Sequence, residues 1–329
     1  MSVLGRTVEE VGRKLDSMLQ EAREARASLE RSWRRNERYL RSKYPKPNRA
    51  HRSDLYSNYI YRVVLHYTTL LTDARPHFNV SVRGRGKWAV SLQKALQAVL
   101  ARWWFENEID RLLMLSVPYL FTHGKIYWKV VWDPAVGEPC VIPVSPWDVF
   151  VDPNARTLAD ADWICQRSVV SRWELLRRYP EEVLEGVKWR KDLSSFPVSV
   201  SEKDVSRYGF SIGPNEFAVL PDVWSGERVP VAMSPSAVEK TEYEEWLIRD
   251  PARLENGAPA YPVCRVIIRA GGKIIADGNY PYWDRWPGWW VEAFANAAGV
   301  NVYGHPEVDQ WVSVQEGLNV SLRLSLIHI

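Results

Sequence analysis

The chain has 329 residues, of which 46% are hydrophobic and 25% are charged, so it is long enough for two or three domains with a sizeable core. This composition excludes wholesale disorder, and the lack of an apolar run near ~20 residues or of an N-terminal apolar h-region predicts a soluble intracellular protein. The net charge is only +3, but residues 23–52 contain eleven Lys or Arg against three Glu, whereas residues 216–262 contain four against nine acidic residues. Three cysteines, at 140, 165 and 264, are too few and too far apart for a disulfide framework.

The first 123 residues have the pattern of a helical region. Apolar side chains recur at helical spacing along the first forty residues, which predicts a long amphipathic helix that ends at two prolines in residues 43–48. A second helix follows, with Ser53 or Asp54 as its N-cap, and its aromatic and β-branched content predicts that it is buried. A short strand at residues 77–83 and a basic turn precede two more helices. The predicted helices cover residues 1–40, 55–73, 87–105 and 109–122.

From Lys125 the pattern changes to short strands, typical of an antiparallel β-meander. Ser171 and Glu174 match the capping box that begins a helix. Residues 191–215 are rich in Ser, Pro and charge and predict a flexible loop, and Gly271-Gly272 is a hairpin signal because both glycines can adopt positive φ. The predicted strands cover residues 126–132, 139–144, 148–151, 163–170, 217–224, 242–249, 263–269 and 273–277.

An aromatic loop at residues 280–290 precedes a last helix that begins near Pro306. The tryptophans of the aromatic loop carry too much apolar area to remain exposed, so we expect them to be buried in an oligomer interface or under the sheet. These tryptophans are Trp283, Trp286, Trp289 and Trp290. The predicted fold is of the α+β class: a helical N-terminal region, then an antiparallel sheet with covering helices, then the start of a long helix. The corresponding ranges are 1–123, 124–304 and 305–323.

The sequence contains no convincing enzyme site: Gly84–Ala89 satisfies GxGxxA, but the predicted helix after it is followed by another helix and not by the second strand of a βαβ unit. Neither a Walker A loop nor HExxH occurs, and the six histidines lack the spacing of metal ligands, so we assign no catalytic, cofactor-binding or metal-binding residue and do not expect an enzyme. One enzyme class stays open. Carboxylate pairs such as Asp160/Asp162 and Glu242/Glu244 could hydrolyse glycosides while tryptophans stack on sugars. A Trp-rich glycan-binding or glycoside-hydrolysing protein is therefore an alternative.

Basic residues gather in the first third of the chain. They could contact phosphates, or they could form a solvated or subunit-bridging helix face, because Arg is also common at protein interfaces. The candidate contacts to nucleic acid or to a partner are Arg34, Arg35, Arg38, Arg41, Arg83, Arg85 and Lys87.

Four stretches stand in a specific order along the chain. They are Arg52–Asn58 with Ala74–Val82, two helices leading into Gly124–Asp133, Val144–Ala155 with Asp160–Trp163, and Gly304-His-Pro with Gln315-Glu-Gly-Leu-Asn319 and Ser321. In order and spacing they resemble the portal proteins of tailed bacteriophages, over most of the length of the chain. The residues that we expect to be structural or to lie in interfaces are Asn58, Arg75, Pro76, Gly124, Asp152, Pro153, Trp286, Trp289, Trp290, Gln315 and Asn319.

The resemblance implies a structural subunit of a ring, usually of twelve copies, that forms the DNA entry and exit channel at one capsid vertex. Residues 1–123 and 124–304 would form the wing of such a subunit, and residues 305–323 would begin its stem helix. The implied location is the virion, after assembly in the bacterial cytoplasm. The implied partners are further copies of the chain, double-stranded DNA, the terminase large subunit, major capsid and scaffolding proteins, and a head-completion adaptor, with no membrane and no cofactor. Another capsid or connector protein is a further alternative.

The last six residues, Leu324–Ile329, can be encoded by the mosaic-end adapter of transposon-based sequencing libraries. We therefore expect native sequence to end near Arg323 and the chain to be a C-terminally truncated fragment of a larger reading frame. The clip, second stem helix, tunnel segment and crown of portal proteins have no counterpart in the sequence. Long-read sequencing of the parent DNA across these codons tests this expectation.

Overall fold

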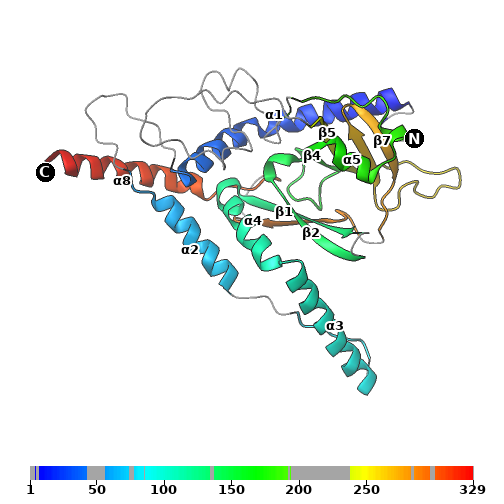
Figure 1. Cartoon of the computed structure of the whole chain (residues 1–329), viewed down its shortest axis with the longest axis horizontal. Coiled ribbons are helices and arrows are strands. Elements are labelled where there is room, and N and C mark those ends of the chain that lie inside the picture. Colours follow the sequence, from blue (N-terminus) through cyan, green and yellow to red (C-terminus); the bar gives the residue numbers. More distant parts are fainter. Residues whose placement is uncertain are drawn as a thin grey trace. The chain divides into compact units, whose positions relative to one another are not determined.

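The fold belongs to the α+β class that the sequence predicts, and it combines helices with two antiparallel sheets (Figure 1). The computed structural model describes residues 4, 7–42, 56–73, 78–84, 86–133, 137–191, 193, 238–282, 285–296 and 301–328. The helices are α1 (Val8–Leu40), α2 (Tyr59–Asp73), α3 (Lys87–Glu106), α4 (Ile109–His123), α5 (Arg172–Arg178), α6 (Glu181–Leu184) and α8 (Val308–His328). The strands are β1 (Lys125–Asp133), β2 (Glu138–Val144), β3 (Val149–Val151), β4 (Trp163–Ser171), β5 (Lys240–Ile248), β6 (Arg265–Ala270), β7 (Lys273–Asn279) and β8 (Trp290–Phe294).

Contacts group the chain into two units that do not follow the order of the sequence. The first unit comprises Met1–Ala25 with Trp147–Gly288, and the second comprises Arg26–Pro146 with Trp289–Ile329. Helix α1 therefore contributes residues to both units. This grouping cuts across the division expected from the sequence, because strands and helices find their partners in distant parts of the chain.

The sheet of the first unit has the strand order β3-β4-β5-β6-β7, and all neighbouring strands are antiparallel. The first half of α1 covers one face, where Leu15 packs in a core with Trp246. Helices α5 and α6 contribute Leu175 and Leu184 to a second core, which contains Tyr243 of β5. Since β5 has side chains in both cores, it is buried along most of its length, whereas the edge strand β7 is partly exposed.

The second unit has a three-stranded antiparallel sheet in the order β2-β1-β8. Helix α4 leads directly into β1 through Gly124, which adopts φ +86° and so ends the helix in the left-handed conformation. The end of α1 packs with α2, α4 and α8 in one hydrophobic core. This core contains Tyr39, Ile60, Val64, Val117, Phe121, Val308 and Val312.

Several predicted local signals are confirmed. The backbone N–H of Glu174 donates to Ser171 Oγ at 3.3 Å, which is the hydrogen bond that a capping box supplies at a helix start. Gly271 and Gly272 adopt φ +54° and +88° between β6 and β7, as the hairpin requires. The helices predicted at residues 87–105 and 109–122 agree with α3 and α4 to within one residue at each end.

Other local predictions were wrong. Residues 78–84 form no strand, because no neighbouring strand pairs with them among the residues that the structure describes. Helix α2 begins at Tyr59, and Asn58 caps it by accepting a hydrogen bond from Tyr61 N at 2.9 Å. Trp290 begins strand β8 instead of lying in an aromatic loop, because this segment pairs with β1. The predicted caps at 53 and 54, strand at 217–224 and most of the loop at 191–215 lie outside the described residues.

Within the described part of the chain, no helical stretch has both the length and the apolar character that a bilayer crossing requires. The three cysteines form no disulfide bond within the described residues; Cys165 and Cys264 are buried and Cys140 is half-buried.

Candidate functional site

A junction of three helices contains residues that the sequence motifs single out. The side-chain amide of Asn58 donates to the carbonyl oxygens of Tyr39 and Leu40, at 2.8 and 3.2 Å, at the C-terminal end of α1. Its side-chain oxygen accepts from the backbone of Tyr61 in α2. One side chain thus satisfies backbone groups that would otherwise be unpaired at the end of one helix and at the start of the next.

Helix α8 completes the junction with two buried amides. Gln315 Oε1 accepts hydrogen bonds from the backbone N–H groups of Tyr59 and Ile60, at 2.8 and 3.2 Å, and Gln315 Nε2 donates to the carbonyl of Ser57 at 2.6 Å. Asn319 Oδ1 accepts from Ser57 N at 3.2 Å. The exposed fractions of Gln315 and Asn319 are only 1% and 3%. The structure therefore brings the predicted residues of α2 and α8 together from distant parts of the chain, and they hold these helices at a defined position.

Two glycines fix the start of β1 against the segment that leads into α8. A Cβ atom on Gly124 would lie 2.6 Å from a backbone carbon ahead of α8, and one on Gly304 would lie 2.7 Å from Gly124 O. Neighbouring Lys125 is fully buried, and its Nζ donates to the carbonyl of Val302 at 2.5 Å and pairs with Glu292 Oε2 at 2.5 Å. Burial lowers the pKa of Lys125, while the Glu292 carboxylate acts in the opposite direction.

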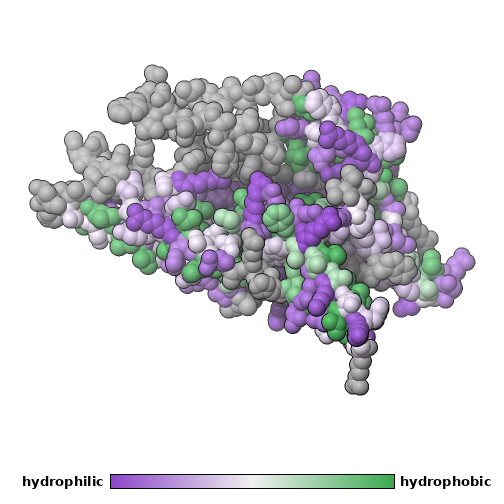
Figure 2. Space-filling model, turned by 60° about the horizontal axis from the view of Figure 1, so that its bottom comes forward, coloured by the Kyte–Doolittle hydropathy of each residue, from purple (hydrophilic) through white to green (hydrophobic). Residues whose placement is uncertain are grey.

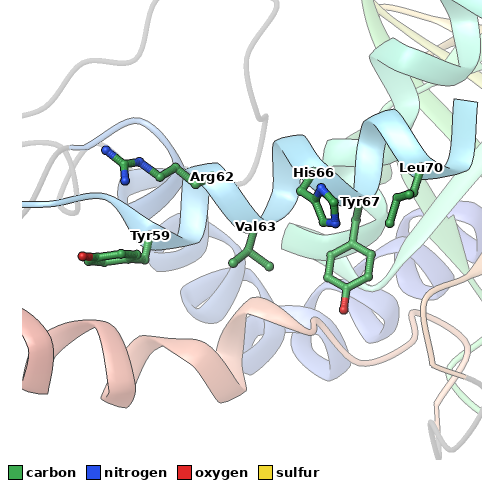
Figure 3. A pocket seen from close by; sticks show the side chains of 6 residues that line it. All are labelled: Tyr59, Arg62, Val63, His66, Tyr67 and Leu70. Atoms are coloured by element: carbon green, nitrogen blue, oxygen red, sulfur yellow. The ribbon is translucent and has the colours of Figure 1, made fainter. Parts of the chain in front are cut away.

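Helix α2 buries only a narrow seam, which consists of Ile60, Val64 and Thr68. The predicted burial of this helix is therefore wrong for most of its surface. A hollow of about 410 Å³ lies along it (Figure 3), lined by Tyr59, Arg62, Val63, His66, Tyr67 and Leu70. The large apolar side chains exposed on α2 are Tyr59, Tyr61, Val63, Leu65, Tyr67, Leu70 and Leu71.

Large apolar side chains are also exposed on other helices of the second unit. Apolar side chains reach the surface over the part formed by α8 and α2, at the left of Figure 2. We call the exposed sides of these helices the apolar faces. Besides the residues of α2, they comprise Trp88, Val90, Leu96, Val99 and Phe105 of α3, Met114, Leu115 and Tyr119 of α4, and Val314, Leu318 and Val320 of α8.

The predicted basic residues fall into two groups on different elements. In α1, Arg34 pairs with Glu30 at 3.3 Å, and Arg35 pairs with Asp309 of α8 at 2.9 Å. Of the others, Arg38 and Arg41 are exposed on α1, Arg83 is exposed in the turn before α3, Lys87 is exposed at the start of α3, and Arg85 lies outside the described residues.

The remaining predicted interface residues belong to the interior or the turns of each unit. Asp152 accepts a hydrogen bond from Asn154 N at 2.9 Å and so closes the turn after β3, beside Pro153. Trp286 Nε1 donates to a backbone carbonyl, that of Leu158, at 2.9 Å. The expected burial is confirmed for Trp289 and Trp290, which are 9% and 3% exposed, whereas Trp286 is only half-buried. Arg75, Pro76 and Trp283 lie outside the described residues.

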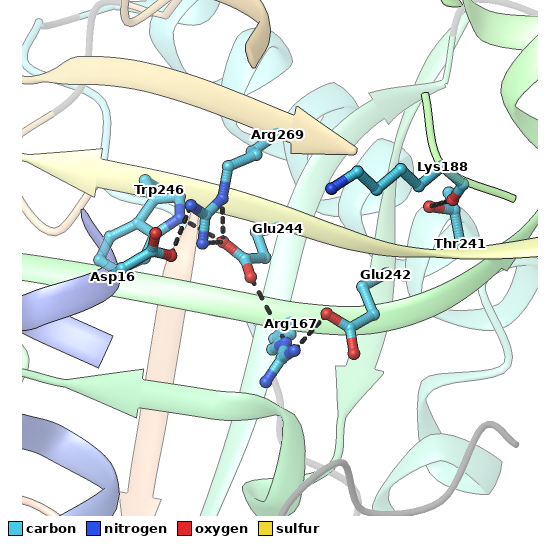
Figure 4. A network of polar contacts seen from close by, with 8 residues as sticks. All are labelled: Asp16, Arg167, Lys188, Thr241, Glu242, Glu244, Trp246 and Arg269. Carbon is cyan, nitrogen blue, oxygen red and sulfur yellow. Dashed lines mark hydrogen bonds and ion pairs between the residues drawn. The ribbon is translucent and has the colours of Figure 1, made fainter. Parts of the chain in front are cut away.

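Sequence reasoning missed a network of buried charges in the first unit (Figure 4). The carboxylate of Glu244 accepts from Arg269 Nε at 2.8 Å and lies 3.4 Å from Arg167 Nε. Arg269 also pairs with Asp16 of α1 at 2.6 Å, and Arg167 pairs with Glu242. The carboxylates of 242 and 244, which the sequence suggested as a pair, are thus each held by a guanidinium. Only the register of β4, β5 and β6, which places 167, 244 and 269 side by side, could have revealed the network.

No protein family model and no curated protein matches the sequence. Among the residues that the structure describes, no group of three or more His, Cys, Asp or Glu side chains could hold a metal ion. The features that stand out are surfaces: the apolar faces of the second unit and the arginines of α1.

Proposed function

We propose that the chain is a structural subunit of a homo-oligomeric ring of the phage portal type, which forms a channel for DNA at one vertex of a capsid. The distribution of exposed apolar side chains carries the proposal. Among the described residues, every exposed large apolar side chain except Val8, Trp173, Leu176 and Leu254 lies in the second unit. Apolar surface of this extent marks a protein contact, because a soluble monomer rarely leaves large contiguous patches in water.

Helix α2 is the clearest example of an apolar surface that lacks a partner within the described chain. Its fifteen residues contain only two formal charges, Arg62 and Asp73, which lie with His66 and Thr69 on one narrow side, while apolar side chains occupy the rest of its circumference. A helix whose apolar surface is much wider than the seam it buries is expected to pack against further protein. Covering about 400 Å² of such surface would stabilise an assembly by about 10 kcal/mol, at about 25 cal/mol per Å², before the cost of association is subtracted.

The polar junction also supports a role in assembly. Asn58, Gln315 and Asn319 tie the start of α2 to α1 and α8, so the apolar faces of α2 and α8 are held in a fixed arrangement. A surface that is already ordered loses less conformational entropy when it docks.

The portal identity within this role comes from the resemblance in the order of motifs. Residues quoted for that resemblance, Gly124 with Gly304 and Asn58 with Gln315, contact one another or share a junction in the second unit. The partners proposed on this ground are further copies of the chain, double-stranded DNA, the terminase large subunit, capsid and scaffolding proteins, and a head-completion adaptor.

The test measures the mass of the full chain by light scattering over about 1 to 50 µM, with electron micrographs of the same samples. We expect one oligomer of defined mass and ring-shaped particles. The double variant Leu65→Glu/Leu71→Glu on α2 should be a folded monomer. The matched control, Leu176→Glu/Leu254→Glu, places the same charges on exposed leucines of the first unit and should still form the ring.

A chain that stays monomeric throughout this range would overturn the proposal, as would equal effects of the two double variants. Aggregates without a defined mass would contradict it as well, because a ring needs one specific contact. Quenching of tryptophan fluorescence by a soluble polysaccharide, in a chain that does not assemble, would instead favour the carbohydrate-binding alternative.

A further inference from the structure

The second half of α1 carries a row of arginines on its outward side. At 1.5 Å per residue the row is about 15 Å long. With 3.6 residues per turn, the arginines gather on the side of the helix opposite the buried residues Trp33, Asn36 and Tyr39. We call this row the basic ridge, and it consists of Arg31, Arg34, Arg35, Arg38 and Arg41.

Nearby carboxylates neutralise only part of the ridge. Arg34 and Arg35 have the partners Glu30 and Asp309, and the carboxylate of Glu30 is itself almost entirely buried. Arg31 and Arg41 are exposed and form no ion pair with any residue that the structure describes. The outward side of the ridge is therefore positively charged.

The ridge lacks the apolar centre that a protein interface needs. Among the described residues of α1, Val8 is the one large apolar side chain that is exposed, and it lies in the first unit, far along the helix from the ridge. The exposed apolar side chains of the second unit are on other elements, chiefly α2, α3, α4 and α8. Protein interfaces have a core depleted of charge, whereas cations can bind a phosphate backbone without an apolar centre.

The guanidinium groups of the ridge are also suited to binding phosphate. All five residues are arginine, and the planar guanidinium fork donates two parallel hydrogen bonds to phosphate oxygens, which the ammonium of Lys does not do. We infer that the basic ridge binds the phosphate backbone of nucleic acid without reading base sequence. The choice of double-stranded DNA as the ligand rests on the proposed function. The inference extends that function by adding a DNA contact surface that lies outside the apolar faces.

Counterion release predicts the size of the effect. The logarithm of the binding constant should fall with the logarithm of salt concentration with a slope of about −0.9 for each phosphate neutralised. If four of the five ridge arginines each neutralise one phosphate, the slope is about −3.6. Removing three arginines should make the slope shallower by about 2.7.

The test measures fluorescence anisotropy of a labelled duplex of about 30 base pairs with the full chain, at about 50 to 200 mM salt. The ridge variant is Arg31→Gln/Arg38→Gln/Arg41→Gln. The control is Arg13→Gln/Arg156→Gln/Arg177→Gln, which removes the same charge from exposed arginines of the first unit. We expect the ridge variant to lose most of the salt dependence and the control to keep it.

Equal losses in the two variants would overturn the inference, since net charge alone would then explain binding. Displacement of the duplex by polyglutamate at equal charge concentration would also overturn it and would assign the ridge to an acidic protein. The variant Arg31→Lys/Arg38→Lys/Arg41→Lys should keep the slope with weaker binding. If it loses the slope like the glutamine variant, the loss reflects damage to α1 and the inference fails.

Light scattering of the same samples separates this inference from the proposed function. A ring that binds the duplex equally well with and without the ridge arginines would refute the inference and leave the assembly proposal standing. A monomer whose duplex binding depends on the ridge would support the inference and count against the ring.

Discussion

Replacing Gln315 with alanine removes the side chain that caps the start of α2 from α8. The substitution deletes the acceptor of two backbone N–H groups, those of Tyr59 and Ile60, and the donor to the carbonyl of Ser57. At about 1 kcal/mol for each hydrogen bond the loss is about 3 kcal/mol, and unpaired buried groups raise it further. We therefore expect the variant to destabilise the second unit by about 3 to 5 kcal/mol.

Two measurements test this expectation. Urea unfolding followed by circular dichroism gives the change in the free energy of unfolding, and hydrogen exchange shows where the loss occurs. A loss of about 3 kcal/mol should speed exchange of the α2 amides about 100-fold, because each 1.4 kcal/mol corresponds to a factor of ten. Gln310→Ala is the matched control, because Gln310 is an exposed glutamine of the same helix, and it should change stability by less than about 0.5 kcal/mol.

Equal stabilities of Gln315→Ala and Gln310→Ala would refute this reasoning, as would unchanged exchange of α2. Gln315→Glu separates the two functions of the amide. Its carboxylate can still accept from the two N–H groups near the positive end of α2, but it cannot donate to Ser57. We expect an intermediate loss for this variant.

Three further substitutions test the close contact of backbones, the buried charges and the buried tyrosine. Gly124→Ala places a Cβ 2.6 Å from backbone and should cost at least about 3 kcal/mol in thermal melts, whereas Gly137→Ala, with a similar positive φ but open space, should cost about 1 to 2 kcal/mol. Equal losses would contradict the steric argument. Glu244→Gln leaves two buried guanidinium groups without their shared carboxylate and should cost about 3 to 5 kcal/mol in urea unfolding, against less than about 0.5 kcal/mol for the exposed control Glu255→Gln. Similar values for the two variants would show that the network is not stabilising. Burial raises the pKa of Tyr243, so above about pH 10 the unfolded chain releases this proton while the folded chain keeps it, and stability falls as pH rises. Tyr243→Phe should make this decline shallower by up to about 1.4 kcal/mol per pH unit, and identical slopes between about pH 10 and 12 would disprove the assignment.

The features that the sequence alone determined are local in origin. Helices α3 and α4 follow from apolar periodicity, the start of α5 from the pairing of Ser171 with Glu174, and the β6–β7 hairpin from two adjacent glycines. Each depends on interactions between residues at most a few positions apart, so the pattern of residues is sufficient to predict it. The α+β class follows from the sum of these local preferences.

Only the tertiary structure decided which of these elements meet. Trp290 belongs to β8 because β1 offers it an edge, and Glu244 forms ion pairs because the register places Arg167 and Arg269 beside it. The exposure of α2 follows in the same way from the narrow seam that its neighbours cover. The predicted residue Gln315 was visible as part of a motif, but its role at the start of α2 was not. Such contacts join residues 25 or more positions apart in the chain, and their free energy depends on burial and strand register that no local pattern records.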